Sequence, residues 1–368
     1  MVSAQKHILV VAKYYPPFRG GIEQYTLDLV NAVEPNYAVT VIVHNHNAKD
    51  EIERHGNVTI IRCGTPWIVK SQPISPSMWW HLSRAKADLV HFSAPNFWAA
   101  ALLNFVGPRC PLVITHHCDV YGRPLLRRVV MPFYRRLVRR SAAVVVTSAK
   151  NVAVSQDLPP GIPRVEVIPC GVDHRKFLQA DADVGRSPAG AVVGFVGRFV
   201  RYKGLPVLIS ALAMLKDVQA VLIGGGELKG ALERQIAELG LASRVRILDG
   251  ADDARKIVEM RNMDIVVLPS IETTEAFGIV QVEAQLLAKP MIASDLATGV
   301  TDVTVNDVTG LLVPPGDAHA LAGAIDRLIR DEVLRKRFGE AGRQRALSSY
   351  TLDIFGDNFR RLFGELLQ

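Results

Sequence analysis

The segment Val192-Val-Gly-Phe-Val196 is apolar throughout, and it is followed directly by Gly197-Arg-Phe-Val-Arg-Tyr-Lys-Gly204 and by an amphipathic stretch over residues 206–215. A short apolar run of this kind is typical of a strand that is buried on both faces. The amphipathic stretch is typical of a helix that packs on a sheet. The same order of strand, loop and helix occurs near the N-terminus, where Ile8–Ala12 precedes the loop Lys13–Gly21.

Apolar runs like these recur along the chain in two series. The first series comprises Ile8–Ala12, Val39–His44, Val58–Arg62, Leu89–Phe92, Leu112–Thr115, Ala143–Thr147 and Val165–Ile168. The second series comprises Val192–Val196, Ala220–Ile223, Val245–Leu248, Ile265–Leu268, Met291–Ser294 and Gly310–Val313. Amphipathic segments separate the runs, and this alternation predicts an α/β fold with two Rossmann-like domains, each a doubly wound parallel sheet, facing a cleft.

The length of 368 residues also fits two domains. A turn-rich stretch without apolar periodicity falls between the two series, and it predicts a linker. We therefore expect an N-terminal domain over 1–178, a linker over 179–190 and a C-terminal domain over 191–350. The last amphipathic segment, within 351–368, is expected to cross back to the first domain.

The composition limits the partners and the compartment. Lys and Arg exceed Asp and Glu by 43 − 36 = 7, which favours anionic partners. The four cysteines form no CxxC pair, a pattern typical of a reducing compartment. No apolar stretch approaches the roughly 18 residues that span a bilayer. These features predict a cytoplasmic protein that touches a membrane surface.

Loops at the carboxyl ends of parallel strands face the ligand crevice of such a sheet. Gly20 and Gly21 lie in one of these loops, where glycine N–H groups can approach a phosphate. Arg198 and Lys203 lie in another, and two cations there suit a diphosphate. Taken alone, a plain turn and a pair of solvated surface charges explain these residues equally well.

The most informative stretch is Leu268-Pro-Ser-Ile-Glu-Thr-Thr-Glu275-Ala-Phe-Gly278, in which a strand gives way to an acidic loop and a helix is expected to start around Phe277. The first-turn amides of that helix can hold a phosphate. Glu275 precedes the helix and Glu283 is expected two turns further in. An acidic helix start stabilised by the macrodipole explains Glu275 but not Glu283.

Another strand of the first series ends in Thr115-His116-His117-Cys118-Asp119. A His–Asp pair there can position hydroxyl groups or exchange a proton near neutral pH. Adjacent histidines on a loop are also common as structural residues. The remaining histidines lack ligand-like spacing, so no metal site is predicted.

Residues 124–140 contain six arginines, no acid and apolar residues at roughly helical spacing. Such a helix can lie on anionic lipid headgroups. The expected membrane-facing residues are Arg127, Arg128, Phe133, Arg135, Arg136, Arg139 and Arg140. A helix packed on its domain with a solvated basic face is the alternative. Nucleic acid is not an expected partner, because no recognition helix or aromatic-bearing sheet motif is present.

Together these stretches resemble the retaining GT-B glycosyltransferases of family 4, a group that includes bacterial cell-surface polysaccharide and lipid glycosyltransferases. The resemblance spans nearly the whole chain. The resemblance rests on five stretches: the Gly20-Gly21 loop, Gly197-Arg198 with Lys203-Gly204, Pro269-Ser270 with Glu275-Ala-Phe-Gly278 and Glu283, Ile168-Pro-Cys-Gly-Val-Asp173, and Thr309-Gly-Leu-Leu-Val-Pro-Pro-Gly316.

The resemblance implies metal-independent transfer of a hexosyl group, with mannosyl as the leading candidate, from a nucleoside-diphosphate sugar and with retention of configuration. It implies no cofactor. The acceptor is expected to be lipid-linked or a growing saccharide in cell-surface polysaccharide or lipopolysaccharide synthesis, at the inner face of the cytoplasmic membrane.

The resemblance also implies roles for single residues. Arg198 and Lys203 would bind the diphosphate and Glu275 the hydroxyls of the donor sugar. The amides of Phe277 and Gly278 would lie near the sugar and phosphate, with Glu283 on the ribose and Gly20 and Gly21 on the diphosphate. His117 would contact donor sugar and acceptor, with His116 and Asp119 in the acceptor cleft.

One departure from the family pattern is Asp295-Leu-Ala-Thr298-Gly299, which stands where Gly-Gly-x-Pro-Glu is commoner. Two rival functions remain open: a nucleotide-sugar epimerase of the same fold, and a non-catalytic, membrane-associated binding module. The pair of glutamates with Phe-Gly between them disfavours the epimerase. The joint presence of both glutamates and both cations disfavours the binding module.

Overall fold

The apolar runs assemble into two sheets, one in each of two units. The computed structural model describes residues 5–18, 20–69, 72–120, 124–178 and 190–368. The first unit runs to Gly171 and includes residues 352–368, and the second comprises Val172–Thr351. Residues 172–178 therefore group with the second unit, not with the first as predicted, because Val172 bridges Thr351 and donates a backbone hydrogen bond to Tyr350. Apart from Gly190, the predicted linker lies outside the described residues.

The sheet of the first unit has eight described strands in the order β10-β9-β8-β7-β1-β2-β4-β3. Their bounds are β1 His7–Val11, β2 Ala38–His44, β3 Glu51–His55, β4 Val58–Cys63, β7 Leu89–Ala94, β8 Leu112–His116, β9 Ala143–Val146 and β10 Val165–Val167. Every described pairing is parallel except β3 with β4. The expectation of a wholly parallel sheet is therefore wrong at this edge, because a two-residue connection between β3 and β4 can join only antiparallel strands.

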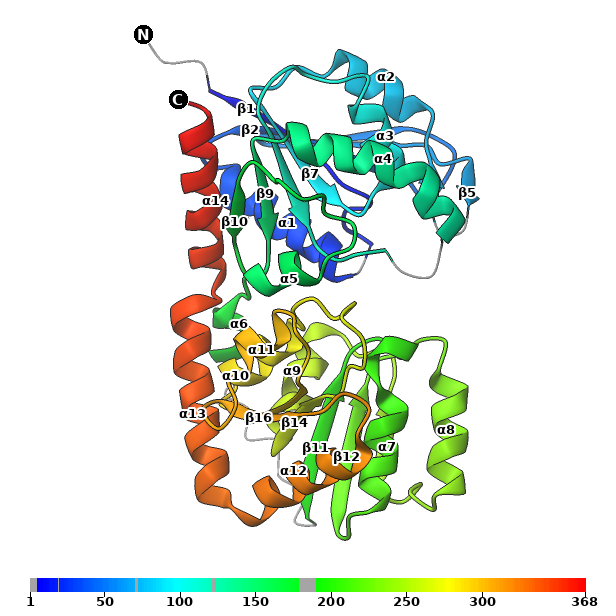
Figure 1. The fold of residues 1–368 in the computed structure, drawn as a ribbon, viewed down its shortest axis with the longest axis vertical. Coiled ribbons are helices and arrows are strands. Elements are labelled where there is room, and N and C mark those ends of the chain that lie inside the picture. The colour runs from blue at the N-terminus through cyan, green and yellow to red at the C-terminus, as the bar shows by residue number, and fades with distance from the viewer. Residues whose placement is uncertain (1–4, 19, 70–71, 121–123, 179–189) are drawn as a thin grey trace. The chain divides into compact units, whose positions relative to one another are not determined.

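Helices cover both faces of this sheet. They are α1 Gly21–Val33, α2 Ser77–Arg84, α3 Phe97–Leu103, α4 Pro124–Arg140, α5 Ala149–Val154 and α14 Leu352–Leu366. One core lies between the sheet and the pair α1 and α14, and a second lies between the other face and α2, α3 and α4. Figure 1 shows α14 alongside α1, where Phe355, Phe359 and Phe363 pack edge to face in series.

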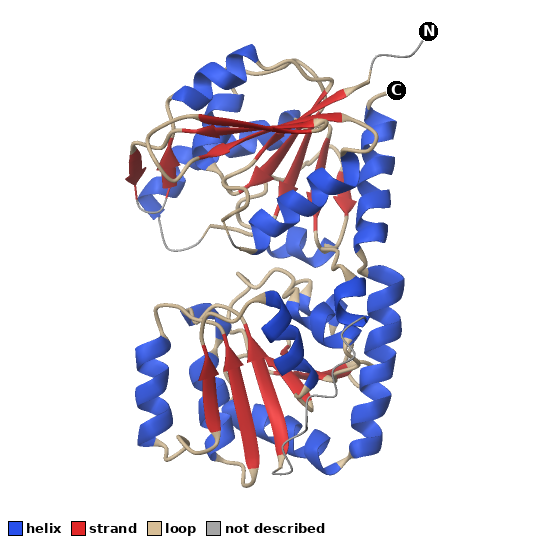
Figure 2. Ribbon diagram, turned by 180° about the vertical axis from the view of Figure 1, so that it is seen from behind, coloured by secondary structure: helices blue, strands red, loops and turns tan. Residues whose placement is uncertain are grey.

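The second unit has a six-stranded sheet in its described residues, in the order β13-β12-β11-β14-β15-β16 and parallel throughout. The strands are β11 Ala191–Val196, β12 Val218–Ile223, β13 Val245–Leu248, β14 Ile265–Leu268, β15 Met291–Ser294 and β16 Gly310–Val313. The helices are α6 His174–Leu178, α7 Leu205–Ala213, α8 Lys229–Glu238, α9 Asp253–Arg261, α10 Val280–Leu286, α11 Val300–Val303, α12 Ala318–Arg330 and α13 Glu332–Ser349. They lie on both sides of the sheet (Figure 2).

This strand order determines where a ligand can bind. Numbered along the chain within the second unit, the order reads 3-2-1-4-5-6, which is the order of dinucleotide-binding folds. The chain reverses direction across the sheet between β11 and β14, and ligands bind at that point, outside the carboxyl ends of the strands. The equivalent reversal in the first unit lies between β1 and β7.

Candidate active site

The loops after β11 and β14 meet at the switch point of the second sheet. After β11 the chain forms a single 3-10 turn, Arg201–Lys203, and Gly204 follows with a left-handed φ of 66°. A Cβ at Gly204 would overlap the carbonyl oxygen of Pro269 in the neighbouring loop. The Ile271 N–H also donates a hydrogen bond to the Tyr202 carbonyl at 2.8 Å. The two loops are therefore packed backbone to backbone, which fixes the side chains that they carry.

Lys203 and Glu275 form an ion pair at this junction. Lys203 Nζ lies 2.5 Å from Glu275 Oε2, and the two side chains are only 11% and 8% exposed. The Ser270 hydroxyl donates to the same carboxylate oxygen at 2.7 Å. Each of these two charges would be costly to bury alone in a low dielectric. A ligand that takes one of them must therefore leave the other with a new partner.

Arg198 lies in the same loop as Lys203 but is exposed. Among the described residues it forms no ion pair. The site therefore has one cation committed to a carboxylate and a second whose guanidinium is open to a ligand. A planar guanidinium with free donors matches the oxygens of a phosphate.

The Glu275 loop is also held from its other side. The Thr298 hydroxyl donates to the carbonyl oxygen of Glu275 at 2.8 Å, and the Gly299 N–H donates to that of Ala276 at 2.9 Å. Thr298 belongs to the stretch that departs from the family pattern. Here that stretch fastens the loop after β15 to the loop that carries Glu275.

The helix after this loop starts later than predicted. Phe277 and Gly278 lie in the loop, and α10 begins at Val280. Phe277 is buried against Tyr350, with ring centroids 5.7 Å apart in an edge-to-face arrangement. Gly278 has a left-handed φ of 70°, which a right-handed helix does not include, so α10 begins only at Val280 and Glu283 lies in its first turn, not two turns inside it.

Glu283 is paired with Lys256, a residue that no sequence motif singles out. Lys256 Nζ on α9 lies 2.8 Å from Glu283 Oε1. Burial acts to lower the pKa of Lys256, but Glu283 and Asp253 outweigh burial and the pKa is raised. No motif predicts Lys256, because its pairing depends on how α9 packs beside α10.

In the first unit, Gly20 and Gly21 lie where α1 begins. Gly20 is the N-cap residue and Gly21 the first residue of this 13-residue helix, and both are exposed. The N–H groups of a first helical turn lack partners within the helix and favour an anion. The predicted position of these glycines at a helix N-terminus agrees with the structure.

The two predicted acceptor-cleft residues His116 and Asp119 bind each other. His116 Nε2 lies 3.1 Å from Asp119 Oδ1, while its Nδ1 lies 2.7 Å from the Tyr134 hydroxyl. Asp119 also accepts hydrogen bonds from the Ser155 hydroxyl at 2.5 Å and the Gln156 N–H at 2.6 Å. Burial raises the pKa of Asp119, but these hydrogen bonds outweigh burial and leave it below its usual value. The pair therefore joins the loop after β8 to the segment after α5.

His117 has different surroundings from its neighbour. Its Nε2 lies 2.9 Å from the Ser93 hydroxyl, and its ring meets the edge of Tyr25 with centroids 4.6 Å apart. Burial, with smaller contributions from His91 and His116, lowers the pKa of His117 to about 3. The imidazole is therefore neutral near pH 7 and can exchange hydrogen bonds but supplies no charge.

Three arginines of the basic helix are bound to other segments of its own unit. Arg127 pairs with Asp157 at 2.5 Å, Arg135 donates to the Gln156 carbonyl and Arg140 donates to the Leu103 carbonyl. These bonds hold α4 to its own unit, and Arg127 and Arg135 are half-buried; that this helix faces a membrane stays a prediction. Arg128, Arg136 and Arg139 are exposed, and Arg140 is exposed too, although its guanidinium is hydrogen-bonded. Phe133 is half-buried against Phe105, with ring centroids 6.0 Å apart.

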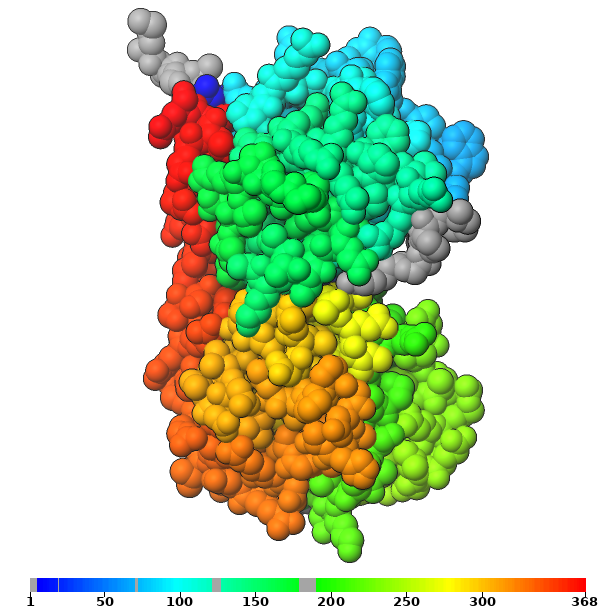
Figure 3. All heavy atoms as spheres, in the orientation of Figure 1, coloured from blue at the N-terminus to red at the C-terminus, as the bar shows by residue number. Residues whose placement is uncertain are grey.

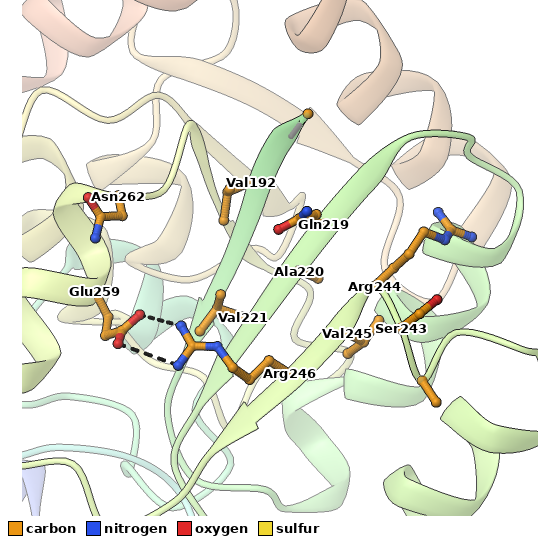
Figure 4. A pocket seen from close by; sticks show the side chains of 12 residues that line it. Val192, Gln219, Ala220, Val221, Ser243, Arg244, Val245, Arg246, Glu259 and Asn262 are labelled. Atoms are coloured by element: carbon orange, nitrogen blue, oxygen red, sulfur yellow. Dashed lines mark hydrogen bonds and ion pairs between the residues drawn. The ribbon is translucent and has the colours of Figure 1, made fainter. Parts of the chain in front are cut away.

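A pocket lies elsewhere in the second unit, where strands β11 to β13 begin (Figure 4). Its volume is about 490 Å³, and the Arg246–Glu259 ion pair lies along its wall. It borders Gly190, the residue directly after the undescribed segment. Since the residues that were singled out from the sequence lie at the opposite ends of the strands, none of them contributes to this pocket.

No helix in the described part of the chain is both long and apolar enough to cross a bilayer. No three His, Cys, Asp or Glu side chains within it converge in a way that could hold a metal ion.

Two family models match the chain. The model described as glycosyl transferases group 1 matches residues 179–345, and that of glycosyltransferase family 4 matches residues 19–176. The O-antigen chain mannosyltransferase C of Escherichia coli is 28% identical over 365 residues, which cover 98% of each chain. The phosphatidyl-myo-inositol mannosyltransferase of Mycobacterium leprae is 31% identical over 284 residues, which cover 75% of this chain and 73% of the relative.

The fold also matches solved structures. Anabaena Alr3699/HepE in complex with UDP-glucose superimposes with a TM-score of 0.78 at 20% identity, over 98% of this chain and all of that one. The α/β architecture expected from the sequence, two doubly wound domains, is confirmed by this likeness.

Proposed function

Since the chain belongs to the family 4 glycosyltransferases and is itself a glycosyltransferase, we propose that it transfers a hexosyl group from a nucleoside-diphosphate sugar to a lipid-linked or saccharide acceptor. The observation that carries this proposal is the ion pair of Lys203 and Glu275 at the switch point, with Arg198 exposed in the same loop.

The ion pair suggests how the site receives its donor. A diphosphate that approaches Arg198 competes with Glu275 for the Lys203 ammonium. When phosphate oxygens take that ammonium, the Glu275 carboxylate loses its cation and needs new hydrogen-bond donors. Hydroxyls of the donor sugar supply them, while Ser270 keeps the carboxylate in place. Binding of phosphate and binding of sugar are in this way coupled through one carboxylate.

The same cations serve the chemical step. As the bond between sugar and diphosphate breaks, negative charge grows on the leaving phosphate, and Lys203 and Arg198 stabilise it without rearrangement. These cations do the work that a metal ion does elsewhere, so we assign no metal to the reaction. We assign retention with attack from the face of the departing phosphate, because Glu275 acts as a hydroxyl ligand and not as a nucleophile.

The remaining site residues are assigned to the ribose, the donor sugar and the diphosphate. We assign Glu283 to the ribose hydroxyls, with Lys256 holding it in place. The amides of Phe277 and Gly278 lie next to Glu275 and suit the sugar and phosphate. Gly20 and Gly21 offer the N–H groups at the start of α1 to the diphosphate.

His117 contributes hydrogen bonding in this scheme. Because it is neutral, it binds hydroxyls of donor sugar or acceptor and does not act as a cationic acid. His116 and Asp119 act on the acceptor only indirectly, by fixing the loop that carries His117.

The hexose and the acceptor class are inferred from the relatives. Two of them are named as mannosyltransferases, one acting on an O-antigen chain and the other on a phosphatidylinositol. We propose a mannosyl donor and a polysaccharide or glycolipid product. We place the enzyme on the inner face of the cytoplasmic membrane, with Arg128, Arg136 and Arg139 of α4 toward anionic headgroups.

The first experiment measures thermal unfolding of the wild type with UDP, GDP, ADP, TDP and CMP compounds at one concentration. A ligand at a hundredfold its dissociation constant stabilises by about 2.7 kcal/mol, and we expect one nucleoside diphosphate to do so. The shift should be reduced in Arg198→Ala and preserved in Lys336→Ala, which removes an exposed lysine on α13. Incubation with the matching sugar nucleotide and acceptor, followed by determination of the anomeric configuration, tests retention. Absence of a shift with every nucleotide would favour the non-catalytic binding module.

A further inference from the structure

Two short strands of the first unit form a ribbon outside its main sheet. They are β5 Trp67–Val69 and β6 Gln72–Ile74, which pair antiparallel. In β6, Pro73 is buried, and this strand packs against α3. In β5, by contrast, Trp67, Ile68 and Val69 are 59%, 63% and 49% exposed. β5 is therefore the outer strand of the ribbon.

The exposure of three consecutive residues is unusual for a strand. Successive side chains point to opposite faces, so Trp67 and Val69 lie on one face and Ile68 on the other. A strand that covers a core buries one of these sets. Here both faces of β5 present apolar side chains to solvent, and nothing within the described part of the unit covers either of them.

This geometry restricts what can cover β5. A flat protein surface would contact one face of the ribbon and leave the other in water. An environment that surrounds the strand covers both faces at once. The headgroup and upper acyl region of a bilayer is such an environment, and tryptophan concentrates there because its ring is apolar and its N–H is polar.

The neighbouring helix carries the charge that an anionic bilayer attracts. Figures 1 and 2 both place β5 beside the N-terminal end of α4. In the first turns of that helix Arg128 is exposed and Val129 is 65% exposed. In the space-filling view the ribbon forms the outer margin of the first unit (Figure 3). Apolar and cationic residues therefore lie together at one margin, as in interfacial membrane-binding elements.

We propose that β5 inserts into the interface of an anionic bilayer, with Trp67, Ile68 and Val69 at the level where headgroups meet acyl chains. Among the described residues the outer edge of β5 has no backbone partner. Its N–H and C=O groups need water, so the strand stops at the interface and does not reach the hydrocarbon centre. This inference rests on the proposed function only in that a lipid-linked acceptor requires the enzyme to reach a membrane.

The test uses the full chain and vesicles of phosphatidylcholine and phosphatidylglycerol in equal amounts. The variant Trp67→Ser/Ile68→Ser should bind these vesicles at least about tenfold more weakly, since each large apolar side chain contributes on this scale when it leaves water. The matched control, Val308→Ser/Val333→Ser, removes two exposed apolar side chains of the second unit and should bind as the wild type does.

A second readout reports depth. Phosphatidylcholine brominated on the acyl chain quenches tryptophans that enter the bilayer, and wild-type fluorescence should fall. In Trp67→Phe most of that quenching should disappear, because Trp98 is half-buried and bonded to the Ser75 carbonyl, while the exposed Trp79 and Trp80 belong to α2 and not to the ribbon. Vesicle binding by Trp67→Phe should be nearly unchanged.

Three results would overturn the proposal. Equal binding by the ribbon variant and the wild type would show that the arginines of α4 suffice. Unchanged quenching in Trp67→Phe would place another tryptophan in the bilayer. Concentration-dependent self-association that is lost in the ribbon variant, with vesicle binding intact, would identify a second copy as the occupant of β5. The nucleotide shift of the purified wild type tests the proposed function separately, without lipid.

Discussion

The hydroxyl of Thr298 donates a hydrogen bond to the carbonyl oxygen of Glu275 at 2.8 Å, and Thr298 is fully buried. The loop after β15 thus fixes the backbone that carries the carboxylate at the switch point. Because Thr298 reaches only the main chain of Glu275, it acts as a positioning residue.

Replacement of Thr298 by Val removes this hydrogen bond at nearly constant volume. A hydrogen bond of this kind contributes about 1 kcal/mol, so we expect kcat to fall about five- to tenfold while nucleoside-diphosphate binding stays unchanged. Thr298→Ser keeps the hydroxyl and should restore kcat. A Thr298→Val enzyme with wild-type kcat would show that the loop keeps its place without the bond.

Replacement of Lys203 by Ala should affect both activity and stability. Loss of one group that stabilises transition-state charge lowers kcat by about 10²- to 10³-fold. The variant also leaves Glu275 buried without its cation, which costs about 3–5 kcal/mol of unfolding free energy. The double variant Lys203→Met/Glu275→Leu should be more stable than Lys203→Ala, although inactive. Urea unfolding compares them, and a double variant less stable than the single one would contradict a mutually compensating pair.

Replacement of Glu283 by Gln should weaken nucleotide binding through the ribose. A hydrogen bond to a carboxylate contributes about 1.5–3 kcal/mol, so the dissociation constant of the nucleoside diphosphate should rise by about ten- to a hundredfold. The 2′,3′-dideoxynucleotide should bind wild type and variant alike, which titration calorimetry measures. If the variant weakened both nucleotides equally, Glu283 would be acting on the fold through Lys256 instead.

Stability should fall as the solution becomes mildly acidic. Burial lowers the pKa of His91 and His117 to about 3 and that of His44 to about 4, against 6.5 for each when it is free. Below pH 6.5 the unfolded chain binds protons that the folded chain excludes, so the loss begins there and grows until the folded pKa values are reached. Three such groups give a slope of at most about 4 kcal/mol per pH unit near pH 5. Urea unfolding between pH 7 and 5 measures this slope. The substitution His91→Gln should remove about one third of the slope. A flat profile would mean that these histidines charge in the folded protein.

Removal of Arg128, Arg136 and Arg139, three exposed arginines of α4, should release the protein from anionic vesicles. Each basic residue near such a surface contributes about 1 kcal/mol, so Arg128→Ser/Arg136→Ser/Arg139→Ser should lose about 10²-fold in affinity. Neutral vesicles should show little difference between this variant and the wild type. Replacement of the three anchored arginines should instead lower the unfolding temperature; these are Arg127, Arg135 and Arg140. Full vesicle binding by the first triple variant in low salt would contradict the electrostatic part of the membrane assignment.

Apart from β3, the strands of both central sheets follow from the sequence alone, because a strand buried on both faces must be apolar throughout, as Ile8–Ala12 and Val192–Val196 are. The ligand-facing loops follow too, since the carboxyl ends of parallel strands meet at one edge and glycines with cations recur there. Peripheral strands do not follow: β3 carries a single apolar residue, Ile52, among charged and polar ones on an exposed edge, and β5 and β6 are three residues long. In such segments pairing, not composition, defines the strand.

The sequence therefore determined the residue types at the site, and tertiary packing decided their partners. Nothing local distinguishes Glu275, which meets Lys203, from Glu283, which meets Lys256 on a different helix. Likewise the adjacent His116 and His117 look alike in the sequence, yet one bonds to Asp119 and the other faces Ser93 and Tyr25. Hydrophobic periodicity is a property of neighbours along the chain. The partner of a buried charge is chosen by segments far apart in sequence, which only the packed fold brings within hydrogen-bonding distance.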